Sequence, residues 1–198
     1  MRRLTLIGAA LLGLLAALPA SAQQLSLGQI SNYLNSIDTA KSPFTQVNAD
    51  GTISTGTLYM DRPGRARFEY NPPEQQLVMA NSGTVVILDK KVGGTPETYP
   101  LGQTPLSIIL SPNVNLNQAG MVKGQSFDGT ATTVTAQDPK RPEYGSIQMK
   151  FTPNPVELRQ WIITDQNGQK TTVILGGLQK VGVPRSLFNI QSEIAKLK

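Results

Sequence analysis

Apolar and polar residues alternate along most of the chain after residue 43, and clusters of Gly, Pro, Asn and Asp interrupt the alternation at short intervals. Alternation with a period of two is typical of strands that bury one face. In segment 65–70, Ala66, Phe68 and Tyr70 fall on one face. The charged residues between them, including Arg65 and Arg67, form the other face, which we expect to be solvated. The pattern predicts ten or eleven strands, at 44–48, 52–60, 65–70, 76–80, 84–89, 97–99, 121–127, 130–137, 144–152, 156–165 and 170–175.

Short turns between these segments favour a largely antiparallel sheet. Three dipeptides are typical of tight hairpins, in which Gly supplies the positive φ: Asp50-Gly51, Asp128-Gly129 and Asn167-Gly168. A twisted sheet of this many strands curls strongly, into a barrel or a half-barrel. The concave face of such a sheet is apolar, so it has to be filled by its own side chains or by a ligand.

Two helices are predicted that could cover the concave face. In the first, Ser26 and Gln29 have the spacing of a capping box, and the apolar residues after them share one helical face: Leu27, Ile30, Leu34 and Ile37. We expect this helix to end within residues 38–43. In the second, Thr104 is placed to cap and Pro105 suits the first helical position of segment 106–110. The polar tail, residues 191–198, is either helical or frayed.

The first residues have the pattern of an export signal. Arg2 and Arg3 precede an apolar run at 4–18, and Ala20-Ser21-Ala22 is a typical cleavage site. A spanning helix needs ~20 apolar residues, so this run is short for a permanent anchor. We therefore predict a signal peptide at 1–22 and a single domain at 23–198. Gln23 follows the cleavage site where a bacterial lipoprotein would carry Cys, so we expect a mature protein free of a lipid anchor, in the periplasm.

Composition excludes several chemistries. The chain has no His and no Cys, hence no imidazole base, no thiol nucleophile, no disulfide and no zinc or iron–sulfur site built on these residues. Its 13 Asp and Glu are scattered, and Asp61, Asp128 and Asp138 stand in turns where Asp is favoured for backbone reasons. The net charge of +5 falls once the two N-terminal arginines are removed and is too small to indicate nucleic acid. We expect no enzyme activity, no metal and no cofactor; a carboxylate enzyme is the alternative.

Two features could serve binding. Arg62 stands in a turn before Pro63, where its five N–H groups could hold a lid by bonding loop carbonyls. A group of apolar residues lies on adjacent predicted strands: Leu58, Met60, Phe68, Tyr70, Leu77 and Met79. These residues could form an ordinary core or line a cavity for a hydrophobic ligand, and their pattern does not distinguish the two.

Residues 56–73, GTLYMDRPGRARFEYNPP, follow the pattern G-x-L-x-x-x-R-P-G-x-x-R-[FW]-x-Y-x-x-P. This segment resembles the signature of the periplasmic outer-membrane lipoprotein carrier family, LolA. Further resemblances follow in order, at Phe44-Thr45-Gln46, Thr104-Pro105-Leu106, segment 157–161 and Val183-Pro184 with Phe188. Together they cover nearly all of residues 27–190.

The resemblance implies an unclosed, strongly curved antiparallel β half-barrel with short α-helices as a lid over a hydrophobic cavity. It implies a monomer that shields the acyl chains of lipoproteins, takes them from an inner-membrane ABC-type releasing complex and delivers them to an outer-membrane acceptor. Arg62 matches the family's turn arginine, which bonds the lid in the closed state. The residues expected to line the cavity are Leu58, Met60, Phe68, Tyr70, Leu77, Met79, Leu106, Ile109, Leu110, Ile147, Met149 and Trp161. An alternative is a module of the same fold that binds another lipid or senses envelope stress.

Overall fold

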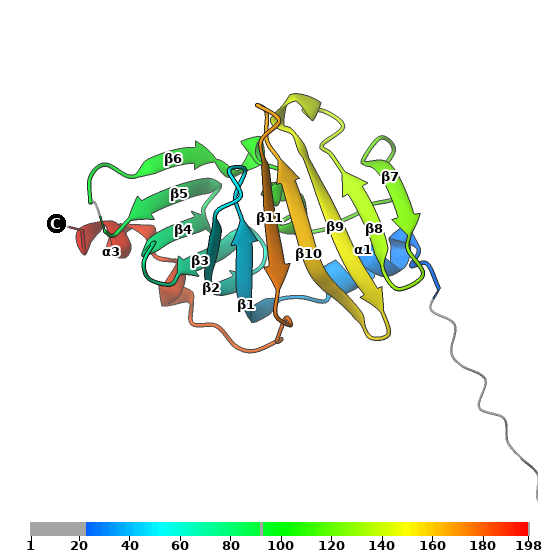
Figure 1. Ribbon diagram of the computed structural model, residues 1–198, viewed down its shortest axis with the longest axis horizontal. Helices are drawn as coiled ribbons and strands as arrows, with labels where there is room; N and C mark the ends of the chain where they lie inside the picture. The colour runs from blue at the N-terminus through cyan, green and yellow to red at the C-terminus, as the bar shows by residue number, and fades with distance from the viewer. Residues whose placement is uncertain (1–22, 92, 198) are drawn as a thin grey trace, which may run out of the picture.

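One antiparallel sheet of eleven strands makes up most of the molecule (Figure 1). The computed structural model describes residues 23–91 and 93–197, so the predicted signal peptide at 1–22 lies outside the described residues. The strands are β1 (Thr39–Val47), β2 (Ile53–Asp61), β3 (Arg65–Tyr70), β4 (Gln76–Asn81), β5 (Thr84–Asp89), β6 (Glu97–Pro100), β7 (Val122–Phe127), β8 (Thr132–Ala136), β9 (Ser146–Pro153), β10 (Val156–Thr164) and β11 (Lys170–Leu175).

The sheet consists of two meanders. Strands β1 to β6 pair in sequence, as do β7 to β11, and the pairing of β1 with β11 joins the two halves. Strands β6 and β7 lie at opposite edges (Figure 1), and no ladder joins them, so the half-barrel is unclosed as expected. The chain between these two edges, residues 101–121, carries the second predicted helix. This connection therefore has to cross the open side of the sheet.

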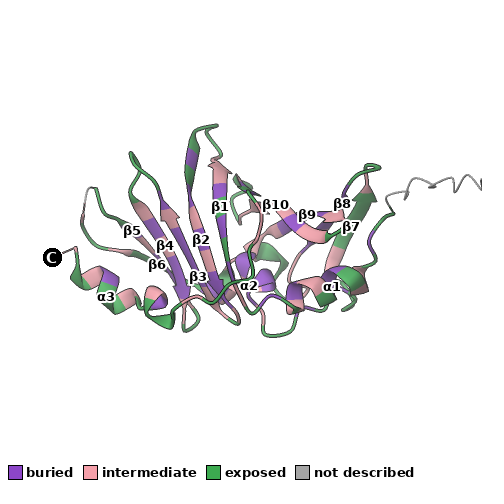
Figure 2. Ribbon diagram, turned by 90° about the horizontal axis from the view of Figure 1, so that it is seen from below, coloured by how far each residue is buried: buried purple, intermediate pink, exposed green. Residues whose placement is uncertain are grey.

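Side chains alternate between two faces, and burial alternates with them along the strands (Figure 2). Register aligns apolar residues across the curve: Leu58 of β2 lies opposite Phe68 of β3, and Trp161 of β10 lies opposite Met149 of β9. Both pairs point to the concave face and belong to one buried cluster. Burial of this apolar face is the main favourable contribution to folding.

Helices lie on both sides of the sheet. The helical segments are α1 (Leu27–Asn35), η1 (Leu101–Gln103), α2 (Leu106–Ile109), η2 (Pro142–Tyr144), η3 (Arg185–Phe188) and α3 (Ile190–Ala195). The capping box at Ser26 and Gln29 is present, as predicted. In contrast, the prediction that Thr104 caps α2 is wrong. Pro105 holds the N-cap position, and the Thr104 hydroxyl instead donates to Leu101 O at 2.8 Å, closing the preceding 3-10 turn.

The first helix and the first strand differ from the prediction, whereas the tail takes the helical one of its two expected forms. Helix α1 ends at Asn35, before the expected 38–43. Strand β1 starts at Thr39 rather than at residue 44, because Ala40 and Ser42 alternate inward in register with β2 despite the Pro at position 43. The tail forms α3, which packs on the convex face of the sheet. Its apolar residues Ile190 and Ile194 cover a second cluster, separate from the concave core: Leu77, Met79, Val86 and Leu88.

The same segment buries Arg67, whose predicted exposure to solvent is wrong. This side chain is only 4% exposed, and its Nη1 donates to Leu187 O at 3.0 Å and lies 3.3 Å from Glu193 Oε1. A charged residue on an otherwise polar strand face looks solvated in the sequence. The covering element arrives more than a hundred residues later in the chain, so a local pattern does not reveal it.

Candidate functional site

The concave face of the sheet and the lid elements α1 and α2 enclose one buried apolar cluster. Of the twelve residues expected to line a cavity, ten lie in this cluster and two do not. The ten are Leu58, Met60, Phe68, Tyr70, Leu106, Ile109, Leu110, Ile147, Met149 and Trp161. Each of them is at most 9% exposed. In this structure their side chains meet one another, so the lid is closed.

Leu77 and Met79 are the two exceptions. They point to the convex face and lie beneath α3, in the second cluster. The reason is the register of β4, in which Val78 lies opposite the inward Phe68. The period of two therefore sends positions 77 and 79 outward. Their expected place in the cavity is wrong.

A chain of aromatic rings crosses the interior. Phe68 packs edge to face against Phe44 at 5.6 Å and against Trp161 of the other half-sheet at 6.2 Å, measured between ring centroids. Such edge-to-face pairs contribute beyond their buried area. Tyr70 supplies the polar end of the chain, because its hydroxyl donates to Gln46 Oε1 at 2.7 Å. Burial raises the pKa of Tyr70 to about 12, although this bond acts against the shift, so the phenol stays neutral.

The two lid elements are joined to each other by polar side chains of α1, which bond the loop after α2. Asn35, at the end of α1, accepts from Val114 N at 2.8 Å and donates to Val114 O at 2.9 Å. One turn earlier, the Ser31 hydroxyl accepts from Leu116 N at 3.1 Å. These bonds fix the loop that follows α2 onto the surface of α1. Neither residue stands out in the sequence, because a single Asn or Ser on a helix carries no signal of a partner eighty residues away.

Arg62 joins the lid to the sheet. It stands in the β2–β3 turn, and its guanidinium reaches both lid elements. On α1 it donates to Leu34 O and to Asn35 Oδ1 at 3.4 Å, and just after the helix it donates to Ile37 O at 3.3 Å. On the segment after α2 it donates to Ser111 O at 2.6 Å.

The position of Arg62 is electrostatically favourable, since a cation stabilises the exposed carbonyls at the C-terminus of a helix such as α1. Burial lowers the pKa of Arg62 from its ordinary value, and the nearby Asp38 acts in the opposite direction. The group stays charged at neutral pH because arginine titrates far above it. A backbone bond from Gly64 N to Leu110 O, at 2.9 Å, adds a second link between this turn and the lid. Arg62, singled out from the sequence as a residue that could bond the lid, does contact both lid elements.

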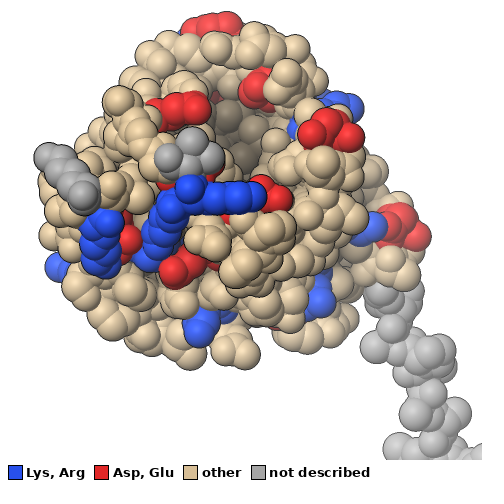
Figure 3. Space-filling model, turned by 60° about the vertical axis from the view of Figure 1, so that its left-hand side comes forward, with Lys and Arg blue, Asp and Glu red and all other residues tan. Residues whose placement is uncertain are grey.

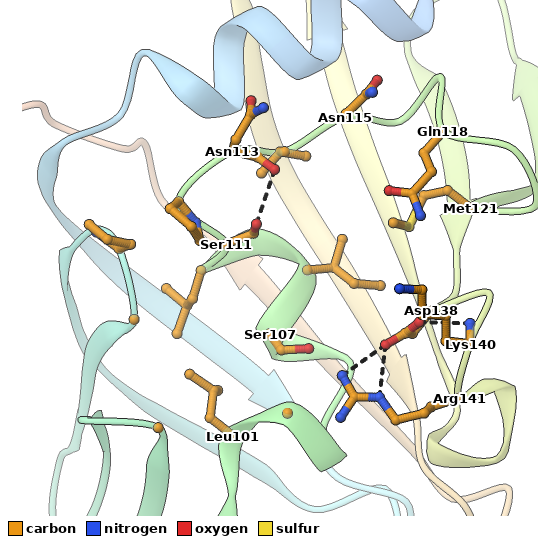
Figure 4. Close-up of a pocket in the computed structure, with 18 of the residues that line it drawn as sticks. Leu101, Ser107, Ser111, Asn113, Asn115, Gln118, Met121, Asp138, Lys140 and Arg141 are labelled. Carbon is orange, nitrogen blue, oxygen red and sulfur yellow. Dashed lines mark hydrogen bonds and ion pairs between the residues drawn. The ribbon is translucent and has the colours of Figure 1, made fainter.

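A groove of about 750 Å³ opens along the outer edge of the lid (Figure 4). It runs from the β2–β3 turn across α2 to the loop at residues 138–141, and Leu110 is the one predicted lining residue that also borders it. The groove is not visible in the sequence, because its walls come from five separate parts of the chain.

The face over the β6 and α3 end carries charges of both signs (Figure 3). Basic and acidic side chains are intermixed there, and the surface is hollowed beside them (Figure 3). Within residues 23–91 and 93–197, no three or more acidic side chains come together in a way that could hold a metal ion. A search of the same residues also finds no helix with the length and apolar character needed to span a membrane.

Comparisons with known proteins agree with this architecture. Residues 35–191 match the family model described as outer membrane lipoprotein carrier protein LolA. An outer-membrane lipoprotein carrier protein from Cupriavidus taiwanensis is 26% identical over 193 residues, covering 91% of this chain and 90% of its own. One from Chromobacterium violaceum is 26% identical over 185 residues, covering 87% and 86%.

Among solved structures, a putative outer membrane lipoprotein-sorting protein domain from Vibrio parahaemolyticus aligns with a TM-score of 0.50 at 7% identity. The alignment covers 85% of this chain and 96% of that one. At this level of identity, the likeness concerns the fold alone.

Proposed function

The chain belongs to the LolA family of outer membrane lipoprotein carrier proteins, and from this premise we propose that it is a periplasmic chaperone for lipoproteins. In this proposal the acyl chains of the cargo occupy the space between the concave face and the lid. The inner-membrane ABC-type complex loads the cargo and an outer-membrane acceptor receives it. The export signal expected at residues 1–22 supports the compartment.

The apolar interior under a hydrogen-bonded lid is the observation that carries the proposal. Each buried CH₂ of an acyl chain contributes ~0.8 kcal/mol, so a lipid-bearing protein does not cross water unaided. Because the interior is filled by its own side chains when the lid is closed, cargo has to displace α1 and α2 from the sheet. Lid opening is then part of binding rather than a separate event.

The Arg62 contacts supply a reversible closure in this scheme. The guanidinium bonds backbone carbonyls rather than a carboxylate, and it bridges the end of α1 and the segment after α2. Such bonds are individually weak once exchange with water is counted, at about 1.5–3 kcal/mol for a charged donor. A lid held this way favours the empty closed state without trapping the cargo. Closing thereby helps to drive release.

Depletion of the protein in its host tests the proposal. Fractionation of the envelope should then show lipoproteins retained at the inner membrane, and a plasmid copy of the chain should restore their outer-membrane location. Unchanged lipoprotein distribution after full depletion would contradict the carrier function. Recovery of free lipid, rather than acylated protein, with the purified chain would favour the alternative of a lipid-binding module of the same fold.

A further inference from the structure

We propose that Gln46 and Ser54 form a hydrogen-bonding site for the carbonyl group of an acyl chain, at the end of the concave face away from Arg62. This role rests on the proposed carrier function and adds a polar contact to it, by which the protein would distinguish acyl cargo from alkyl chains of the same length. Two hydrogen-bond donors that no group in the described part of the protein uses lie side by side there, on a wall that is otherwise mostly apolar.

Gln46 and Ser54 lie opposite each other on neighbouring strands. Register pairs Gln46 of β1 with Ser54 of β2, and directly opposed residues have Cβ atoms ~4.5–5.5 Å apart. Both side chains point to the concave face, because Phe44 and Leu58, an even number of residues away on the same strands, belong to the buried cluster there. Ser54 is 8% exposed and Gln46 is half-buried. The pair therefore stands where the apolar interior meets water.

The amide of Gln46 is fixed at both of its polar atoms. Tyr70 donates to Oε1 at 2.7 Å, and Nε2 donates to Asn48 Oδ1 at 2.6 Å. Strand β2 separates Tyr70 from Gln46, but the residue of β2 opposite Tyr70 is Gly56, which has no side chain to stand between them. A primary amide has two N–H groups, and among residues 23–91 and 93–197 only Asn48 accepts from Gln46. The second N–H is thus held in place and free for a ligand.

Ser54 supplies the other donor. Its hydroxyl bonds no group within the described residues, whereas the hydroxyl of Ser42, on the same face of β1, donates to Pro43 O at 2.8 Å. The Ser54 oxygen is also within reach of a ligand. Arg62 Nε is the only side-chain polar atom of the described residues that is fully buried and lacks a partner, so the unbonded Ser54 oxygen is not sealed off.

A neutral carbonyl group fits these two donors. Every acyl chain ends in a carbonyl, whose oxygen has two lone pairs and can accept from both. Neither donor is charged, and burial of a carbonyl without a donor costs free energy, so the pair offsets the water that the group loses. Beyond it, the row across the sheet continues with the apolar Val173 and Trp161. Ser54 precedes Arg62 by eight residues, or ~26 Å of strand, which leaves the length of the interior for hydrocarbon.

Two lipopeptides of identical sequence test the site with the mature protein. In one, two saturated chains are joined to the glyceryl group by ester bonds. In its twin, chains of the same length are joined by ether bonds and carry no carbonyl. Titration calorimetry below the micelle concentrations gives both affinities, and their ratio cancels the contribution of the hydrocarbon that the twins share.

Ser54→Ala should lower the ratio of ester to ether affinity about fivefold, the effect of one neutral hydrogen bond. The fold should be unaffected, since no described group bonds this hydroxyl. Gln46→Met should lower the ratio by a similar factor. Thr45→Val is the matched control, because it removes a hydroxyl next to Gln46 on β1 but from the convex face. An unchanged ratio in Ser54→Ala or Gln46→Met, or an equal fall in Thr45→Val, would overturn the site.

Infrared spectra of the complexes report the hydrogen bond itself. The ester carbonyl absorbs apart from the amide bands and moves to lower frequency when its oxygen accepts a hydrogen bond. We expect a lower frequency in the parent complex than in the Ser54→Ala complex, and equal frequencies would overturn the site while leaving the carrier proposal standing. If the parent protein binds neither lipopeptide, the carrier function itself is contradicted, and this site with it.

Discussion

Replacing Arg62 by Leu should loosen the lid more than it destabilises the sheet. The guanidinium donates to acceptors on α1 and to Ser111 O after α2, so its loss removes bonds on both sides of the lid at once. A hydrogen bond from a charged donor contributes about 1.5–3 kcal/mol, and we take the lower half because Arg62 is only partly buried. Loss of the Ser111 bond alone then raises the equilibrium constant for lid opening about tenfold.

Hydrogen–deuterium exchange resolved by segment measures this directly. Amides of residues 106–118 should exchange about tenfold faster in Arg62→Leu, while those of β9 and β10 keep their parent rates. Arg65→Leu is the matched control, since it removes the same charge at the first residue of β3, just after this turn, but breaks a bond to Asp61 instead of the lid. Parent-like exchange at 106–118, or equal acceleration throughout the sheet, would refute the assigned role of Arg62.

Two further predictions concern the stability of the sheet and of α3 on its convex face. Gly56→Ala should destabilise the fold by about 2 kcal/mol or more in chemical denaturation, because an added Cβ would lie 2.3 Å from Glu69 O and 2.8 Å from the Phe44 ring. Gly28→Ala in α1 is the control. A Cβ at position 28 meets nothing nearer than 3.9 Å, so this variant should be more stable by about 0.5 kcal/mol. Glu193→Gln should cost about 1.5 kcal/mol at pH 7, because Arg67 loses one charged partner at 3.3 Å but keeps Glu69, also at 3.3 Å, and its bond to Leu187 O. Burial acts to raise the pKa of Glu193, but Lys196, Arg67 and Lys90 together lower it below its ordinary 4.5. The carboxylate's contribution is therefore complete above pH 4.5 and lost as the pH falls through the lowered pKa, so the difference between parent and variant should shrink in acid denaturation curves; a constant difference would contradict the ion pair's role.

The local sequence pattern was sufficient to predict which segments form strands and where the hairpins turn. All three Asp-Gly and Asn-Gly turns have the positive φ that the hairpins require, and the alternation of Phe68 and Tyr70 placed them correctly on the concave face. The helix α1 followed from its capping box and apolar face. These features depend on neighbours within a few residues, so a short stretch of sequence is enough to predict them.

Long-range contacts were the source of the errors in side-chain burial. Leu77, Met79 and Arg67 were misplaced because α3 covers the convex face from the far end of the chain. The bonds of Asn35 and Ser31 to the lid, and the groove bordered by Lys140 and Arg141, depend on how distant loops meet. Arg62 could be singled out because a turn arginine has several N–H groups for loop carbonyls and because it matches the family's turn arginine, but its acceptors could not be identified.

Binding of a defined lipopeptide tests the central claim most directly. The mature chain would be mixed with a triacylated lipopeptide and with its unacylated twin of the same sequence, and the complexes would be separated by size and identified by native mass spectrometry. We predict a complex with the acylated form alone, with quenching of Trp161 when an acyl chain carries bromine. Equal binding of the two forms, or no complex with either, would contradict the account.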